Sequence, residues 1–228
     1  MLKVCKFGGS SVAGAEQFRK VRDIVLSDAS RRVVVISAAG KRTSDDHKLT
    51  DLLYLCHAHL TYGVSCADIL AAIRSRFVSI RDELGLSYRV EDEFDAYAAT
   101  LSRDTSVDEL VSRGEYFTAR LMAETLGYTF VDAADCVFFG FDGQFDRART
   151  DAAIAAALEK NGKIVLPGFY GRVPTGKIKV MTRGGSDITG ALAAAAVNAD
   201  VYENWTDVSG ILMADPRIVE NPRPIPRI

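Results

Sequence analysis

The sequence predicts an α/β protein whose central sheet is mostly parallel. Residues 2–7 form a short β-prone run that ends in two glycines, and apolar residues recur at helical spacing over 15–28. Residues 33–36 are four consecutive β-branched residues, a pattern typical of a strand that is covered on both faces. A strand, a helix and a second strand in this order favour parallel pairing of the two strands.

The rest of the chain continues the alternation. The polar segment 40–48 is long enough to be a mobile loop, and residues 49–127 are predicted to be mostly helical, with breaks near Gly63 and Gly85. Further expected elements are strands at 128–132, 163–168 and 200–205, helices at 150–160 and 187–197, and a hairpin at 171–181 that turns at Pro174-Thr175-Gly176. The proline-rich segment 220–228 is predicted to be extended.

Composition excludes several classes of protein. The chain has 228 residues, 48% of them hydrophobic and 25% charged, with a net charge of −2, so it is neither disordered nor basic enough overall to favour a nucleic acid partner. No apolar run reaches the roughly 18 residues of a membrane span, and the opening residues MLKVCKF lack an apolar leader pattern, so export is not expected. Four cysteines without a CxxC pair predict free thiols and a cytoplasmic location.

The first candidate site follows the first predicted strand. Lys6, Phe7, Gly8, Gly9 and Ser10 would place a lysine beside a tight turn whose N–H groups, next to a helix N-terminus, can bind an anion. The segment is neither a Walker-type loop nor a Rossmann fingerprint. An ordinary corner between a strand and a helix is the alternative interpretation.

The second candidate is the segment 182–187, before a predicted helix. Ser186 is a plausible N-cap, Arg183 offers a planar fork for a carboxylate or phosphate, and Asp187 lies in the first helical turn. Asp187 is equally explained by the helix dipole.

Two weaker candidates complete the set. Thr206 and Asp207 end a predicted strand, where the ligands of open α/β sheets gather, and Arg217 follows nearby. Glu115 follows a glycine within a helical pattern, and its carboxylate could bind an ammonium group. The alternatives are a polar turn for the first pair and a solvated helix carboxylate for Glu115. The three histidines form no metal signature.

Taken together, four motifs resemble the aspartokinases of the amino acid kinase superfamily. They are KFGGSS, VSRGE, TRGGSD and WTDVSGILMADPRIV, in this order between residues 3 and 219. The resemblance implies a three-layer α/β/α sandwich. It also implies transfer of the γ-phosphoryl of ATP to the side-chain carboxylate of L-aspartate, which opens the pathway to lysine, threonine and methionine.

The resemblance also implies roles for individual residues. Lys6 and Asp187 would be catalytic, and Mg²⁺ would be held mainly through the nucleotide phosphates. Glu115 would bind the ammonium group of aspartate and Arg183 its α-carboxylate, while Thr50 would also contact this substrate. The expected nucleotide-binding residues are Lys6, Phe7, Gly8, Gly9, Ser10, Ser186, Thr206, Asp207, Leu212 and Arg217.

Several points stay open at this stage. Thr43 competes with Thr50 for the substrate contact. Residues 1–228 would be one catalytic domain without the C-terminal FGAK-like motif and the ACT regulatory domains of the family, and the resemblance allows a homodimer. The alternatives are a kinase for glutamate or N-acetylglutamate, and a catalytically incomplete nucleotide-binding fragment.

Overall fold

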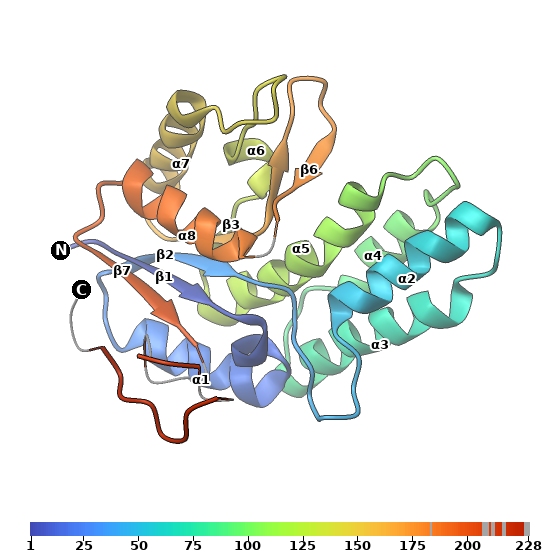
Figure 1. The fold of residues 1–228 in the computed structure, drawn as a ribbon, viewed down its shortest axis with the longest axis horizontal. Coiled ribbons are helices and arrows are strands. Elements are labelled where there is room, and N and C mark those ends of the chain that lie inside the picture. The colour runs from blue at the N-terminus through green and yellow to red at the C-terminus, as the bar shows by residue number, and fades with distance from the viewer. Residues whose placement is uncertain (183, 207–209, 211–212, 216–217, 226–228) are drawn as a thin grey trace.

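A five-stranded parallel sheet forms the centre of the molecule (Figure 1). The computed structural model describes residues 1–182, 184–206, 210, 213–215 and 218–225. The strands are β1 (Lys3–Phe7), β2 (Arg31–Ile36), β3 (Thr129–Phe130), β4 (Ile164–Pro167) and β7 (Val201–Trp205). Their order in the sheet is β3-β4-β2-β1-β7, and every neighbouring pair is parallel, as the sequence predicted.

The β-branched run of β2 explains why this strand lies at the centre. Val33, Val34, Val35 and Ile36 are all completely buried. Alternate side chains of the run enter two different hydrophobic clusters: Val34 and Ile36 join one, and Val33 and Val35 join the other. Because successive side chains of a strand point to opposite faces, both faces of the sheet are covered.

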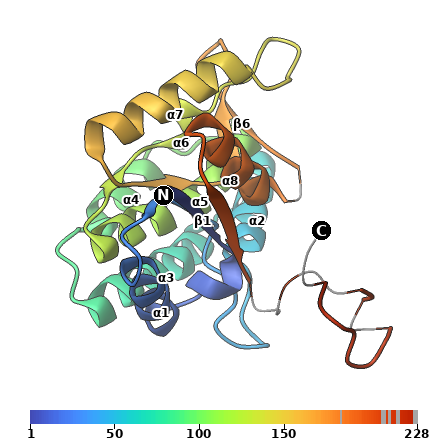
Figure 2. The same ribbon diagram turned by 90° about the vertical axis from the view of Figure 1, so that its left-hand side faces the viewer.

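Two layers of helices cover these faces (Figure 2). On one face lie α1 (Ala15–Leu26) and α5 (Val107–Leu126), with α2 (Leu49–Tyr62), α3 (Ala67–Leu84) and α4 (Val90–Ala98) packed beyond them. The other face carries α6 (Ala133–Cys136), α7 (Arg147–Asn161) and α8 (Gly185–Ala196). The three-layer α/β/α sandwich is therefore confirmed.

Glycines end the long helices where the sequence predicted breaks. Gly63 and Gly85 follow α2 and α3 with φ of 69° and 66°, the left-handed conformation that glycine adopts without strain. The predicted hairpin is also present, as the antiparallel pair β5 (Tyr170–Arg172) and β6 (Ile178–Val180). The short helices α4 and α6 were not predicted as separate elements. No helix in the described part of the chain has the length and apolar character to cross a membrane.

Candidate active site

The candidate site lies where the parallel strands end. Phe7 at the end of β1 is in register with Ile36 of β2 on one side and with Trp205 of β7 on the other. The loops that leave these strands therefore meet at one edge of the sheet, which is where ligands bind in open α/β folds. The segments 8–12, 37–40 and 206 all begin at this edge.

Lys6 and Asp187 are brought together at this edge, although 181 positions separate them in the sequence. The Lys6 side chain is 10% exposed, and its Nζ lies 2.7 Å from Oδ1 of Asp187. Asn204 Nδ2 donates to the same oxygen at 2.9 Å. Asn204 is the register partner of Lys6 across β1 and β7, so the strand pairing itself places the amide beside the ion pair. Sequence reasoning missed Asn204 because its partner was unknown without this register.

The glycine turn after β1 is packed backbone against backbone with the loop after β2. Gly40 donates its N–H to the carbonyl of Gly9 at 2.8 Å. A Cβ on Gly9 would lie 2.9 Å from the Ala38 carbonyl oxygen, and a Cβ on Gly40 would lie 2.6 Å from the backbone of Gly9. Only glycine allows this approach. The helix next to the turn is a single 3₁₀ turn, η1 (Gly9–Val12), and α1 begins later, at Ala15.

Phe7 and Ser10 differ in what they can offer a ligand. Ser10 lines a cavity of about 440 Å³ together with Gly9 and residues of the loop after β2. The Phe7 ring is instead 1% exposed and stacks on Trp205, with ring centres 6.0 Å apart. Any contact of Phe7 with a nucleotide would therefore involve its backbone.

Two adjoining cavities form the open part of the site. The first, of about 440 Å³, is bounded on the β1 side by the glycine turn and by Lys41 of the 40–48 loop. The second, of about 590 Å³, is bounded on the far side by Phe169, Met181, Thr182 and Gly184. Both cavities are lined by Lys48, Thr50 and Glu115, so these three residues mark the junction. Thr43 is exposed and lines neither cavity, so the structure brings Thr50 rather than its competitor into the site.

Glu115 is an uncompensated buried acid at this junction. It is 5% exposed, and its Oε2 has no hydrogen-bond partner among the described residues. Burial raises the pKa of Glu115 to about 8, although a hydrogen bond from the Ala38 backbone acts in the opposite direction. The preceding Gly114 explains the tight packing here, because a Cβ on it would lie 3.0 Å from Ala38 Cβ. A buried carboxylate without a partner fits an ammonium ligand.

The start of α8 borders the second cavity. Gly184 precedes this helix with a φ of 81°, and its carbonyl accepts from Asp187 N at 2.9 Å. Ser186 is 9% exposed and packs against Gly168, where a Cβ would lie 2.6 Å from its Oγ. Arg183, Asp207, Leu212 and Arg217 were also predicted to bind substrate or nucleotide, and these four lie outside the described residues.

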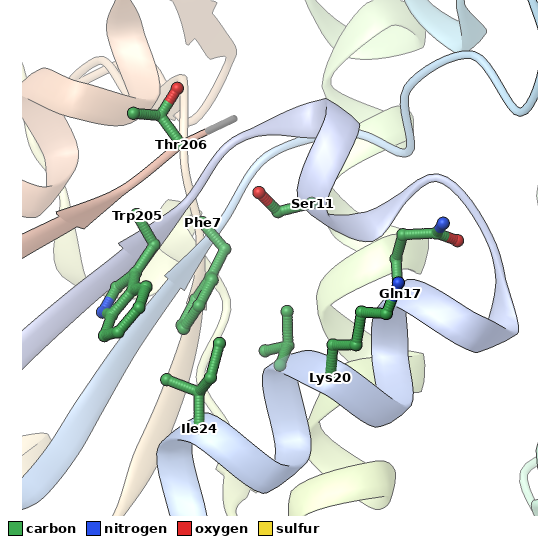
Figure 3. Close-up of a pocket in the computed structure, with 8 residues that line it drawn as sticks. Phe7, Ser11, Gln17, Lys20, Ile24, Trp205 and Thr206 are labelled. Atoms are coloured by element: carbon green, nitrogen blue, oxygen red, sulfur yellow. The ribbon is translucent and has the colours of Figure 1, made fainter. Parts of the chain in front are cut away.

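Thr206 lines a third, smaller cavity of about 170 Å³ on the α1 side of the edge. Figure 3 shows the Phe7 and Trp205 rings side by side, with Ile24 of α1 below them and Ser11 of η1 nearby. Thr206 is therefore near the end of β1, but it borders this cavity rather than the two that meet at Glu115.

The 40–48 loop, predicted to be mobile, is tied to α3 by Arg76. This side chain is 5% exposed, and its guanidinium donates to the carbonyl oxygens of Gly40 and His47. It also lies 3.5 Å from the carboxylate of Asp46. One buried cation thus holds both ends of the loop. The sequence did not predict this role, because no motif surrounds Arg76.

The junction holds no cysteine and no cluster of metal-binding side chains among the described residues. All four cysteines are free, as predicted, and the structure also buries all four; burial raises the pKa of the Cys56 thiol to about 12. No cysteine lines either of the two adjoining cavities. Among the described residues, no group of three or more His, Cys, Asp or Glu side chains could hold a metal ion.

The fold and site define a class of protein: an α/β/α sandwich with a lysine–aspartate pair and glycine turns at the sheet edge. The model of the amino acid kinase family matches residues 1–228, and the chain belongs to this family. Curated relatives include Aspartokinase 3 of Bacillus subtilis, 34% identical over 98% of this chain and 52% of the relative, and lysine-sensitive aspartokinase 3 of Escherichia coli, 34% identical over 99% and 53%. The chain spans about half the length of these relatives.

Solved structures agree with this placement. The aspartate kinase of Clostridium acetobutylicum superimposes with a TM-score of 0.91 at 45% identity, covering 98% of this chain and 51% of that one. Aspartokinase III of E. coli, solved with aspartate and ADP, gives a TM-score of 0.82 at 31% identity, covering 99% and 53%. The resemblance to aspartokinases stated from the motifs is therefore confirmed.

Proposed function

We propose that residues 1–228 form the catalytic domain of an aspartokinase, which phosphorylates the side-chain carboxylate of L-aspartate to give 4-phospho-L-aspartate. The observation that carries this proposal is the pair of adjoining cavities, with cationic and glycine-rich walls on one side and the buried, unpartnered Glu115 where they meet. The 45% identity to an aspartate kinase supports the choice of substrate.

The nucleotide would bind along the glycine turn. The N–H groups of Gly9 and Ser10, which line the first cavity, would donate to phosphate oxygens, and Lys6 supplies a positive charge at the end of β1. Gly8 is proposed to contact the nucleotide as well, although its own N–H already donates to the Trp205 carbonyl oxygen at 3.4 Å. Asp187 holds the Lys6 ammonium group in place, and Asn204 in turn holds Asp187. Ser186, Thr206, Asp207, Leu212 and Arg217 are proposed as the remaining nucleotide contacts.

The residues also fit a nucleotide that carries Mg²⁺. Bound Mg²⁺ would neutralise phosphate charge during transfer. Asp187 is the carboxylate beside Lys6, and its side chain is 47% exposed, so its second oxygen can face a metal held by the phosphates. No cluster of acidic ligands is needed for this arrangement.

Aspartate would bind in the second cavity. Glu115 would pair with its ammonium group, Thr50 would contact it at the junction, and Arg183 is proposed to bind its α-carboxylate. The side-chain carboxylate would then point toward the first cavity and the γ-phosphate. This carboxylate is already a nucleophile, so no general base is required, and catalysis consists of orienting two anions and offsetting their repulsion.

Formation of an acyl phosphate tests the proposal. The chain is incubated with Mg-ATP and L-aspartate, L-glutamate or N-acetyl-L-glutamate, and the product is trapped with hydroxylamine. Product is expected from aspartate alone, and Lys6→Ala is expected to lower the rate by at least 100-fold because the transferring phosphoryl loses its cation. The exposed Lys160→Ala serves as the matched control and should retain the rate. Turnover of glutamate but not aspartate would contradict the proposal.

A homodimer and a cytoplasmic location remain predictions. Support for self-association comes from four exposed apolar side chains on and just after α2, namely Tyr54, Leu55, Tyr62 and Val64. Light scattering after size exclusion measures the mass in solution, and a monomer at every concentration would contradict the dimer.

A further inference from the structure

Lys48 occupies the junction of the two cavities. It is the last residue before α2 and lines both cavities, together with Thr50 and Glu115. The residue is exposed, and within the described part of the chain its ammonium group has no hydrogen-bond or ion-pair partner. An unpaired cation that faces both halves of a site is placed to bind an anion shared between them.

The other cations near the junction are already engaged. Lys6 pairs with Asp187 at 2.7 Å, and Lys41 donates to the carbonyl oxygen of Ser44 at 3.2 Å and lines the first cavity only. Glu115, the acid at the junction, is proposed to bind the substrate ammonium and forms no ion pair with Lys48 among the described residues. Lys48 is therefore the described cation that both faces the two cavities and lacks a partner.

Arg76 fixes the position of Lys48. Its guanidinium donates to the carbonyl oxygen of His47 at 2.8 Å and to that of Gly40, which are the residues directly before Lys48 and Lys41. Arg42 adds a second tie inside the loop through its ion pair with Asp46 at 2.9 Å. The backbone that carries Lys48 is thus held in place before any substrate binds, so little ordering is left for the binding step.

We propose that Lys48 binds the side-chain carboxylate of the acceptor where the two cavities meet, and that Arg76 is the residue that positions it. The inference rests on the proposed function and names a further contact for the same substrate. With the substrate ammonium at Glu115, the reacting carboxylate has to reach from the second cavity toward the phosphates. A fixed cation at the junction offsets the repulsion between this carboxylate and the phosphates.

The comparison of L-aspartate with L-asparagine tests the contact without turnover. The two amino acids differ only in the group that Lys48 is proposed to bind. Calorimetry should show that Lys48→Met weakens aspartate binding by about tenfold to hundredfold and leaves asparagine binding nearly unchanged. Because Lys48 is exposed, this variant is expected to fold.

Two lysines serve as matched controls. Lys41→Met removes a charge from the same loop, and Lys177→Met removes an exposed charge from the β5–β6 turn. Both should keep the wild-type ratio of aspartate to asparagine affinity. A ratio that is unchanged in Lys48→Met, or one that falls equally in Lys41→Met, overturns the proposal.

A double substitution separates positioning from general structural damage. Arg76→Gln alone should lower the preference for aspartate over asparagine. In a Lys48→Met background the same change should have no further effect on that preference, because the cation that it positions is gone. Additive losses of preference would overturn the role of Arg76, since they would show that it acts independently of Lys48.

Failure of the inference can be told apart from failure of the proposed function. A wild-type chain that forms acyl phosphate from aspartate, while Lys48→Met keeps the aspartate preference, retains the function and loses the inference. A wild-type chain that binds aspartate in preference to asparagine through Lys48 but forms no acyl phosphate retains the inference and loses the function. A chain that binds neither amino acid overturns both.

Discussion

If Glu115 binds the substrate ammonium as proposed, this one buried side chain links substrate binding to stability. Its carboxyl group is buried with one oxygen unpartnered, and burial raises its pKa to about 8. The nearest cations on the 40–48 loop are Lys41 and Lys48. Among the described residues, neither forms an ion pair with Glu115. The group is therefore mostly neutral at pH 7 in the free protein and has to lose its proton to pair with an ammonium group.

Aspartate affinity is expected to rise with pH for this reason. Below a pKa of about 8, binding of the ammonium group has to displace the proton of Glu115, so the dissociation constant should fall as pH rises from about 6 to 8, by up to about tenfold per unit. Calorimetry in buffers of different ionisation enthalpy would detect the released proton. A dissociation constant that is flat over this range would contradict the assignment of Glu115.

The stability of the free protein should fall, and not rise, as the pH increases. The folded pKa of Glu115, about 8, lies above its ordinary value of 4.5, so the unfolded chain binds fewer protons between these values and folding weakens as pH rises through this window. Glu115→Gln removes that cost and is expected to be more stable than wild type at pH 8, by a few kcal/mol, and similar at pH 4. Thermal unfolding at both pH values measures the difference, and a less stable variant at pH 8 would rule out this account.

At the scale of elements, the contact between the turn after β1 and the loop after β2 forms the floor of the first cavity. Gly40→Ala would place a Cβ 2.6 Å from the Gly9 backbone, so one of the two segments has to move. We expect a loss of about 1–3 kcal/mol in stability and at least tenfold weaker binding of an ATP analogue. Unfolding in urea and nucleotide titration provide the two measurements.

Gly14→Ala is the matched control for this change. Gly14 precedes α1 in the same part of the chain, but its nearest contact for a Cβ is Gln17 Oε1 at 3.5 Å, an ordinary van der Waals distance. Its backbone φ of −167° is also open to any residue. Equal losses of stability and nucleotide affinity in the two variants would show that the tight contact at Gly40 does not cause them.

Sequence patterns identified most elements because their signals are local. The run Val33–Ile36 predicted a buried central strand, and Gly63 and Gly85 marked helix ends. The same locality explains what was missed. Asn204 reaches Asp187 only through the pairing of β1 with β7, and Arg76 reaches the 40–48 loop only through the packing of α3. Neither of these contacts produces a periodic pattern in the sequence.

At the scale of the whole molecule, the site joins the two ends of the sequence. β1 near the N-terminus pairs with β7 near residue 200, and the ion pair of Lys6 with Asp187 links β1 to the first turn of α8 as well. A nucleotide held by both segments should therefore stabilise the whole sheet and not only a local loop.

Hydrogen exchange can detect this coupling. Addition of a Mg²⁺-bound ATP analogue should slow amide exchange both at residues 8–12 and in β7 (Val201–Trp205), because both border the proposed nucleotide site. The β5–β6 hairpin, whose turn is exposed, provides the internal reference and should exchange at an unchanged rate. Protection confined to residues 8–12 would show that β7 takes no part in binding.

The close approach of Gly9 and Gly40 also limits which amino acids can replace them during evolution. Every other amino acid carries a Cβ, so each missense change at either position places an atom inside the neighbouring backbone. Compensation by a second mutation is blocked as well, because the obstacle is main chain and no smaller side chain can relieve it. Lineages that keep the function should therefore retain glycine at both positions.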